Sequence, residues 1–290
     1  MTASLIEGND VARNIRDIIK ETVSTQSRQG KRPPGLAVVL LGNDPASSIY
    51  VNYKRKACAE VGFNSWEHNL PLETSEKELL GLIDTLNNND EVDGILVQLP
   101  LPGHINTTSI IERISPTKDV DGFHPYNLGR LAQGNPMIRP CTPYGVIQLF
   151  EHYQLAMSGK NAVIVGASNI VGRPMALELL LQKATVTICH RLTQQLEKHI
   201  QNADIVVVAT GIYDVVKTSW LNDKQVIVDI GMHRRADGKV HGDMNFDEAR
   251  KRVQWITPVP GGVGPMTICT LLQNTLLAAS LHITDQYHPN

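Results

Sequence analysis

The amino-acid sequence predicts an α/β protein made of two open α/β domains that flank a cleft. Short apolar runs, which indicate buried strands, alternate along the chain with segments of helical spacing. The length of 290 residues suits two domains, and a proline-bounded linker at 140–143 separates two such series. We therefore expect a first domain over residues 1–140, a second over 141–266, and a C-terminal helix, 267–290, that packs back on the first.

The first predicted domain begins with a strand that is buried on both faces, because six consecutive apolar residues precede Gly42. In residues 75–87 the apolar side chains recur every three or four positions, which indicates an amphipathic helix. The expected strands are 36–41, 63–70 and 94–100, the expected helices are 47–61, 75–87 and 107–114, and residues 118–122 form a loop.

The second predicted domain opens with a helix that has Thr142 as its N-cap and Pro143 in its first turn. Apolar runs then mark four strands, and a long apolar helix follows near the end of the chain. The expected helices are 142–153, 171–182 and 265–280, and the expected strands are 162–166, 184–190, 205–209 and 226–230.

Composition excludes several classes of protein. Hydrophobic residues make up 42% of the chain, and no run reaches the roughly 18–20 apolar residues of a membrane span. Lys and Arg (27) nearly balance Asp and Glu (29), which argues against a nucleic-acid or membrane-surface partner. The first ten residues are polar and acidic, so we expect no signal peptide and a cytoplasmic protein.

Cysteine and histidine patterns give no sign of a disulfide or a metal site. Cys58, Cys189 and Cys269 lie in predicted elements, and we expect them to be buried in a reducing compartment. The pattern does not place Cys141. The ten histidines show no metal-ligand spacing, so no metal is expected.

Residues 258–267 combine three prolines with three glycines immediately before the last predicted helix. Glycine admits backbone angles that other residues avoid, and proline fixes φ. A plain connection between a strand and a helix rarely needs so many of both. We therefore expect a rigid loop whose backbone approaches a ligand, with a tight connection as the alternative.

Gly166 follows a predicted strand and opens a predicted helix, and Gly172 comes six residues later. A glycine turn in this context can hold a pyrophosphate at a helix N-terminus, which would make the second domain Rossmann-like. Ser168 stands where a second glycine is usual, so a plain turn remains the alternative.

The strand after this helix ends at His190, where an acidic residue would bind the ribose of NAD. Arg191 follows instead, and a cation suits the 2′-phosphate of NADP. Arg173 at the helix start is a second candidate, with a solvent-facing arginine as the alternative. Thr210 and Gly211 follow the next strand, where small residues would let a nicotinamide ribose approach closely.

Tyr50 and Lys54 lie four residues apart, so a helix places them on one face. Short-chain dehydrogenases share this spacing, but there it follows the nucleotide-binding glycines, so we reject that assignment; a surface pair is the alternative. Gln98 interrupts an apolar strand near its carboxyl end, where α/β sheets bind ligands, unless nearby backbone satisfies its amide. Asp121 is a candidate carboxylate for a guanidine-like ring, unless it forms an Asx turn as Asp119 could.

Together these segments resemble the bifunctional methylenetetrahydrofolate dehydrogenase/methenyltetrahydrofolate cyclohydrolase family over nearly the whole chain. The resemblance rests on the Tyr-x3-Lys pair, the segments 94–100, 118–122 and 140–143, the Gly166 turn, and above all residues 258–267. It implies a two-domain fold, NADP and tetrahydrofolate derivatives as ligands, and a homodimer.

The resemblance also implies residue roles. Lys54 would be the catalytic lysine with Gln98 as its partner, Tyr50 would pack on the folate, and Asp121 would anchor the pterin. The loop at 258–267 would line the cleft between folate and nicotinamide. The predicted catalytic residues are Tyr50, Lys54, Gln98 and Asp121; the predicted substrate contacts are Tyr50, Asp121, Gly262 and Pro265; the predicted NADP contacts are Gly166, Ala167, Ser168, Ile170, Arg173, Arg191, Thr210, Gly211 and Ile230.

The implied chemistry constrains Lys54. Hydride transfer from 5,10-methylenetetrahydrofolate leaves a methenyl cation, which water converts to 10-formyltetrahydrofolate. An ammonium about 4 Å from that cation would oppose it by roughly 4 kcal/mol at an effective dielectric of about 20. We therefore expect Lys54 to act as a neutral base, favoured by burial and by the neighbouring cations Arg55 and Lys56.

Two other interpretations remain to be weighed. Another two-domain NADP dehydrogenase, acting on an amino acid or a shikimate-like acid, would explain Gly166 and Arg191 but not Gln98, Asp121 and the 258–267 loop together. A non-catalytic protein that binds NADP or folate would not need Lys54.

Overall fold

The computed structural model describes residues 2–42, 45–234 and 238–287, and the side chains of 2–42, 51–233 and 238–282. The chain divides into two compact units. The six-strand unit comprises Met1–Arg13 and Thr142–Thr267, and the three-strand unit comprises Asn14–Cys141 and Ile268–Asn290. Residues 1–13 therefore differ from the predicted division, which placed them in the first domain.

The three-strand unit contains a parallel sheet in the order β3-β2-β4. Its central strand is buried along its whole length, because even-numbered side chains enter one apolar cluster and odd-numbered side chains enter another. The strands are β2 (Gly35–Leu41), β3 (Asn64–Leu70) and β4 (Gly94–Val97).

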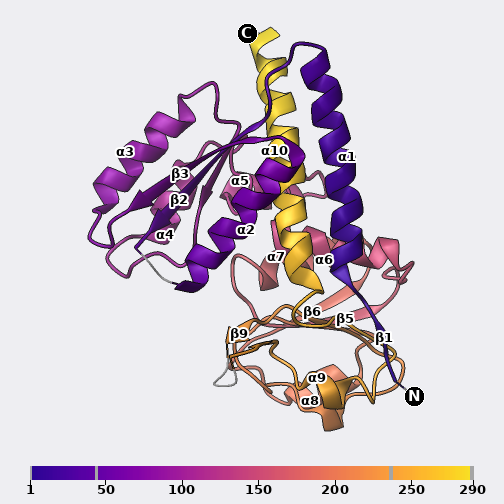
Figure 1. The fold of residues 1–290 in the computed structure, drawn as a ribbon. Helices are drawn as coiled ribbons and strands as arrows, with labels where there is room; N and C mark the ends of the chain where they lie inside the picture. The colour runs from indigo at the N-terminus through magenta and orange to yellow at the C-terminus, as the bar shows by residue number, and fades with distance from the viewer. Residues whose placement is uncertain (1, 43–44, 235–237, 288–290) are drawn as a thin grey trace. The chain divides into compact units, whose positions relative to one another are not determined.

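Helices cover both faces of this sheet. The cluster on the even-numbered face takes residues from α1, α2 and α10, and the cluster on the other face takes residues from α3 and α4. In Figure 1, α1 and α10 run side by side, and residues of both line a shared apolar groove. The helices are α1 (Gly8–Arg28), α2 (Pro45–Val61), α3 (Glu76–Asn87), α4 (Thr107–Arg113), α5 (Pro125–Ala132) and α10 (Val263–Tyr287).

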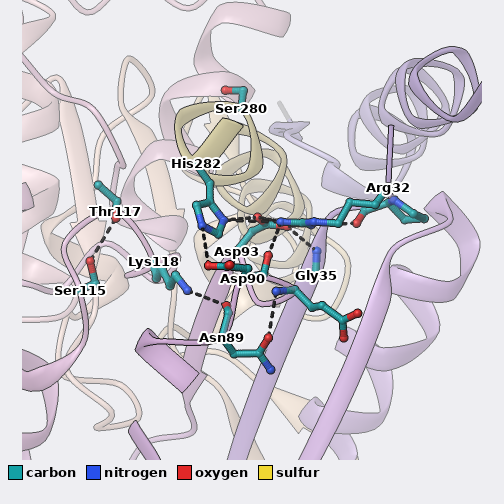
Figure 2. Close-up of polar contacts among 12 residues, drawn as sticks. Arg32, Gly35, Asn89, Asp90, Asp93, Ser115, Thr117, Lys118, Ser280 and His282 are labelled. Atoms are coloured by element: carbon teal, nitrogen blue, oxygen red, sulfur yellow. Dashed lines mark hydrogen bonds and ion pairs between the residues drawn. The ribbon is translucent and has the colours of Figure 1, made fainter. Parts of the chain in front are cut away.

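A buried carboxylate attaches α10 to the start of the sheet. Asp93 precedes β4 and is 1% exposed. It accepts hydrogen bonds from both terminal nitrogens of Arg32, at 2.7 and 2.8 Å, and from Gly35 N at 2.8 Å. Its Oδ1 lies 3.2 Å from Nδ1 of His282 on α10 (Figure 2). The hydrogen bond to Asp93 raises the pKa of Arg32. The part of α10 from Ile268 onward therefore belongs to the three-strand unit.

The six-strand unit contains a parallel sheet in the order β1-β11-β8-β7-β5-β6. Residues 1–13 belong here because β1 pairs with β11, some 250 residues further along the chain. The strands are β1 (Ser4–Leu5), β5 (Asn161–Val165), β6 (Thr185–Cys189), β7 (Ile205–Val208), β8 (Val226–Asp229) and β11 (Trp255–Ile256), with β9 (His233–Arg234) and β10 (Val240–His241) as a separate antiparallel pair. The helices are α6 (Cys141–His152), α7 (Gly172–Leu181), α8 (Leu196–Gln201), α9 (Phe246–Ala249) and the 3₁₀ turn η1 (Thr218–Trp220).

The start of α6 corrects one expectation and answers another. The helix begins at Cys141, so Thr142 lies in its first turn rather than at its N-cap, and its hydroxyl lies 2.9 Å from that of Thr267. Cys141, which the sequence did not place, is buried and donates its thiol to Val120 O at 3.2 Å.

The other three cysteines are buried as predicted, and all four are free thiols. Burial raises the pKa of Cys58 and of Cys269 to about 12, which keeps these thiols protonated and unreactive. Nowhere in the described part of the chain is there a helix of the length and hydropathy that a membrane span requires.

The attachment of α10 leads to a stability prediction. Asp93→Ala leaves the Arg32 guanidinium and Gly35 N without their buried acceptor, so we expect unfolding free energy to fall by about 3 kcal/mol. Asp84→Ala is the matched control, because Asp84 makes the same two-bond pair with Arg113 in an exposed position, at 2.5 and 2.7 Å. Because solvent screens this exposed pair, Asp84→Ala should lose much less unfolding free energy than Asp93→Ala does. Urea unfolding measures both, and equal losses would contradict the role given to Asp93.

Candidate functional site

Helix α2 turns Lys54 into the protein. Val51, Lys54 and Cys58 share the buried face, as residues three and four apart do on a helix, and Lys54 is 8% exposed. Arg55 and Lys56 are the two cations that were expected to favour an uncharged Lys54. Both are exposed to solvent, so they do not share the buried surroundings of Lys54. Tyr50 lies on the same helix four residues earlier, but its side chain falls outside the described residues.

Gln98 holds the amine of Lys54. The residue follows β4, and its Oε1 accepts a hydrogen bond from Lys54 Nζ at 3.0 Å. Its Nε2 donates to Leu99 O at 2.8 Å. A carbonyl can only accept, so the second bond fixes which end of the amide faces the lysine. The amide is therefore satisfied both by nearby backbone and by Lys54.

Asp119, not Asp121, organises the acidic loop. The Asp119 carboxylate is 2% exposed and accepts hydrogen bonds from Phe123 N (3.2 Å), His124 N (2.8 Å) and Asn127 Nδ2 (2.9 Å). Burial raises the pKa of Asp119 to about 7 despite these donors. For both Asp119 and Asp121 the sequence left open a structural role, in which the carboxylate accepts backbone N–H groups of its own loop. The structure gives that role to Asp119.

The Asp121 carboxylate is half-buried and accepts no hydrogen bond from the residues the structure describes. Burial raises its pKa, and the charge of Lys54 opposes that rise. The two groups are therefore electrostatically coupled. Asp121 remains available as an acceptor for N–H groups of a ligand.

Lys118 fixes the start of this loop, and sequence reasoning did not identify it. Its ammonium donates to three backbone oxygens at the end of α3: Leu86 O (3.3 Å), Asn87 O (2.9 Å) and Asn89 O (2.9 Å). Figure 2 shows it reaching Asn89. Burial lowers the pKa of Lys118. A cation at a helix C-terminus is favourable, so Lys118 anchors the loop that carries Asp121.

Hydrogen bonds within the proline–glycine loop (residues 258–267), and one from Gly8 at the start of α1, hold the loop in place. Gly262 N donates to Pro258 O at 2.9 Å, and Gly8 N donates to Gly261 O at 2.8 Å. A Cβ on Gly262 would lie 2.6 Å from Pro258 O, so the turn itself requires glycine there. The tight connection, which the sequence left as the alternative, therefore accounts for the glycine at this position. A Cβ on Gly264 would have space, since Met232 Cε, the nearest atom it would meet, would lie 3.8 Å away.

Packing explains both glycines of the Gly166 turn. Gly166 has φ of +128°, and a side chain there would overlap Ala209 O. A side chain on Gly172 would overlap Gly166 O. Ser168 Oγ accepts hydrogen bonds from Val171 N at 3.2 Å and Gly172 N at 3.3 Å, so it ties the turn to the first residue of α7.

The two candidate arginines lie at the carboxyl edge of the six-strand sheet. Arg173 is in the first turn of α7, and Arg191 comes two residues after the end of β6. Both side chains are exposed, and neither guanidinium bonds to another residue of the described part of the chain; the backbone N–H of Arg173 donates to Ser168 O at 3.0 Å. Guanidinium groups suit phosphate, so the residues present fit NADP.

Other predicted cofactor contacts gather at the same edge. Ile230 follows β8 and donates its N–H to Val208 O at 2.9 Å, and Thr210 and Gly211 follow β7. Ala167 and Ile170 are half-buried in the Gly166 turn. Pro265, a predicted substrate contact, is half-buried in the first turn of α10.

One residue at this edge was missed from the sequence. Asp243 Oδ2 accepts hydrogen bonds from Thr210 N at 2.6 Å and Gly211 N at 3.0 Å. No local pattern marks it beyond its position directly after Gly242. The part of the chain that the structure describes contains no group of three or more His, Cys, Asp or Glu side chains placed to hold a metal ion.

Two family models match the chain. The model of the tetrahydrofolate dehydrogenase/cyclohydrolase catalytic domain matches residues 6–121, and that of the tetrahydrofolate dehydrogenase/cyclohydrolase NAD(P)-binding domain matches residues 140–283. Together they cover almost the whole sequence. The first match contains the residues around Lys54, and the second contains those around Gly166.

Individual proteins match over nearly their full length. The bifunctional protein FolD of Legionella pneumophila (strain Paris) is 60% identical over 280 residues, which is 97% of this chain and 99% of that protein. The crystal structure of bifunctional FolD from Campylobacter jejuni is 45% identical, with a TM-score of 0.93 and coverage of 96% of this chain and 99% of that one. FolD from Trypanosoma brucei, solved with NADP cofactor and an inhibitor, is 36% identical, with a TM-score of 0.93 and coverage of 98% and 99%.

The raised pKa of Asp119 predicts a pH dependence. The value of about 7 in the folded protein lies above the reference of 3.8, so the folded state binds a proton more tightly than the unfolded state. Unfolding free energy should therefore fall as the pH rises from about 4 to about 7. Asp119→Asn keeps an acceptor oxygen but cannot titrate, so its fall should be shallower, by at most about 1.4 kcal/mol per pH unit.

Urea unfolding at a series of pH values measures this slope. Glu73→Gln, at an exposed position, is the control and should run parallel to the wild type. If Asp119→Asn also runs parallel to the wild type, burial of Asp119 does not shape the pH dependence.

Proposed function

The chain belongs to the tetrahydrofolate dehydrogenase/cyclohydrolase family, and we propose from this that it oxidises 5,10-methylenetetrahydrofolate with NADP⁺ and hydrolyses the product to 10-formyltetrahydrofolate. The observation that carries the proposal is the buried Lys54 amine, held by Gln98 and coupled to Asp121. A general base on the three-strand unit and an edge suited to a dinucleotide on the six-strand unit are what the two reactions need.

Lys54 serves the hydrolytic step. An uncharged amine has two N–H groups and one lone pair, and one N–H can donate to Gln98 Oε1 at 3.0 Å. The lone pair is then free to take a proton from the attacking water. Because Gln98 Nε2 is tied to Leu99 O, the amide cannot turn its donor end toward Lys54. Gln98 therefore orients the base without competing for its lone pair.

Asp121 serves substrate binding. Its carboxylate accepts nothing from the described residues, so it can accept the N–H groups of the pterin ring. Lys118 and Asp119 hold the loop around it, which fixes the carboxylate before substrate arrives.

The six-strand unit binds the cofactor. NADP⁺, when bound, supplies the hydride acceptor of the oxidation. The Gly166 turn and the start of α7 lie where α/β sheets bind pyrophosphate. Arg191 and Arg173 are the candidate partners of the 2′-phosphate. Gly262 and Pro265 remain proposed contacts of the substrate, and Tyr50 its proposed aromatic face.

The proposal includes a homodimer in the cytoplasm. The resemblance to the family implies the dimer, and β6 offers a surface for it, because it is an edge strand of the sheet as described and carries Ile188, which is 40% exposed. A single-chain mass of 32.0 kDa in sedimentation would contradict the dimer. Recovery of the protein from a membrane or extracellular fraction would contradict the compartment.

Lys54→Met separates the two reactions. Methionine keeps the apolar stem and removes the amine, so hydrolysis of supplied methenyltetrahydrofolate should fall by about a hundredfold or more. Hydride transfer needs close and aligned carbons rather than a base, so the dehydrogenase rate should fall less. Stopped assays of each step measure this. Full retention of hydrolysis, or loss of NADP⁺ binding, would remove Lys54 from the proposed role.

Arg191→Ala tests the cofactor preference. Loss of the cation should raise the KM for NADP⁺ by about tenfold and leave the KM for NAD⁺ unchanged, because only NADP⁺ carries the 2′-phosphate. Arg173→Ala is the comparison, since it alters the other exposed arginine at the same edge. If Arg191→Ala leaves the preference intact, Arg191 does not bind the 2′-phosphate.

A further inference from the structure

Three loops at the carboxyl edge of the six-strand sheet converge on one buried carboxylate. Asp243 is fully buried and comes two residues after β10. The loop that follows β7 contains Thr210 and Gly211, and His233 lies in β9, just after β8. The sequence distance from Thr210 to Asp243 is 33 residues, so the contact exists only in the folded chain.

The carboxylate of Asp243 contacts these loops through both of its oxygens. Oδ2 accepts from Thr210 N (2.6 Å) and Gly211 N (3.0 Å), and Oδ1 pairs with His233 Nε2 at 2.6 Å. The Thr210 hydroxyl lies 2.9 Å from Oδ2 and 3.2 Å from Ile212 O, so its one proton has two acceptors nearby. The backbone oxygen of Asp243 accepts a further bond, from Asp214 N at 2.6 Å. The residue therefore holds the 210–214 loop at both of its ends.

A second buried carboxylate positions the first. Asp229, at the end of β8, accepts hydrogen bonds from Asp243 N (2.9 Å), Met244 N (2.9 Å) and Gly231 N (3.0 Å). Burial, with the nearby charge of Asp243, raises the pKa of Asp229 to about 6. The structure leaves no space around the pair, because a side chain on Gly231 would overlap Asp243 and one on Gly242 would overlap Asp229.

The loop so held is the one proposed to lie beside the nicotinamide ribose. Gly211 has φ of +68° and nothing within 4 Å of the position that a Cβ would take, so one side of the loop is open. The backbone N–H groups of residues 210 and 211 both point to Asp243 and cannot turn toward a ligand without breaking those bonds. The carboxylate thus decides which face of the loop a ligand meets.

We propose that Asp243, held by Asp229 and His233, is a positioning residue that fixes the Thr210–Gly211 loop for NADP binding. This rests on the proposed function, because it assumes that the loop contacts the dinucleotide. Asp243 touches neither substrate nor cofactor in this role; it acts through the loop. The described hydrogen-bond partners of Asp243 lie within the six-strand unit, whereas Lys54 and Gln98 lie in the three-strand unit.

Asp243→Ala is the test. The change removes all four side-chain acceptor contacts, so the Kd for NADP⁺, measured by calorimetry without folate, should rise about tenfold or more. The dehydrogenase kcat/KM for NADP⁺ should fall by a similar factor. Hydrolysis of supplied methenyltetrahydrofolate needs no dinucleotide and should stay within about twofold of the wild type. Asp243→Asn keeps one acceptor oxygen, so its Kd for NADP⁺ should lie between that of the wild type and that of Asp243→Ala.

Asp204→Ala is the matched control. Asp204 lies in the same unit, accepts Asn161 N at 2.8 Å, and precedes β7 at the opposite end of the strand from Thr210. Its NADP⁺ affinity should stay within about twofold of the wild type. If Asp243→Ala binds NADP⁺ as tightly as Asp204→Ala does, the proposal is overturned. If the wild type itself neither binds NADP⁺ nor oxidises methylenetetrahydrofolate, the proposed function fails instead.

A second pair of variants keeps the question decidable if Asp243→Ala does not fold. Thr210→Val is nearly isosteric and removes the hydroxyl next to Asp243 Oδ2, whereas Thr210→Ser keeps it. Weaker NADP⁺ binding in the valine variant, with wild-type binding in the serine variant, supports the positioning role. Wild-type binding in both overturns it.

Discussion

The parallel direction of the strands is the constraint on which both candidate sites depend. In each main sheet every strand runs the same way, so the carboxyl ends meet at one edge. Gln98 follows β4 at such an edge, and the loop with Asp121 runs beside that strand, since Asp119 bridges to Ile95. Thr210 follows β7 at the edge of the other sheet. Helices cover the apolar faces and leave these edges to carry polar chemistry.

Buried charges fix the loops at those edges. A carboxylate removed from water is costly unless donors replace the lost solvent, and here backbone N–H groups supply most of them. Asp119 organises the loop of the three-strand unit, and Asp243 with Asp229 organises the loops of the six-strand unit. Lys118 does the same with backbone oxygens. Each loop is thereby set before a ligand arrives, which lowers the entropy lost on binding.

Local patterns predicted the strands that are buried on both faces and most of the helices that cover them. The helix α1 was not among the predicted elements, although its apolar residues Val11, Ile15, Ile19 and Val23 recur every four positions, as on one face of a helix. Local patterns also could not pair Ser4 with Trp255, since each strand has two residues and the pairing arises only on folding.

The site could be predicted where a residue type conflicted with its local pattern. Gln98 conflicts with its apolar strand, the resemblance to the family implied that it is the partner of Lys54, and the two are in contact. Asp243 gave no such conflict, and its role depends on a contact across 33 residues.

The most direct measurement is the fate of methylenetetrahydrofolate mixed with wild-type protein and NADP⁺. NADPH should form, and 10-formyltetrahydrofolate should follow without accumulation of the methenyl compound. Two results would contradict the account: no NADPH forms, or methenyltetrahydrofolate accumulates and disappears no faster than it does without the protein.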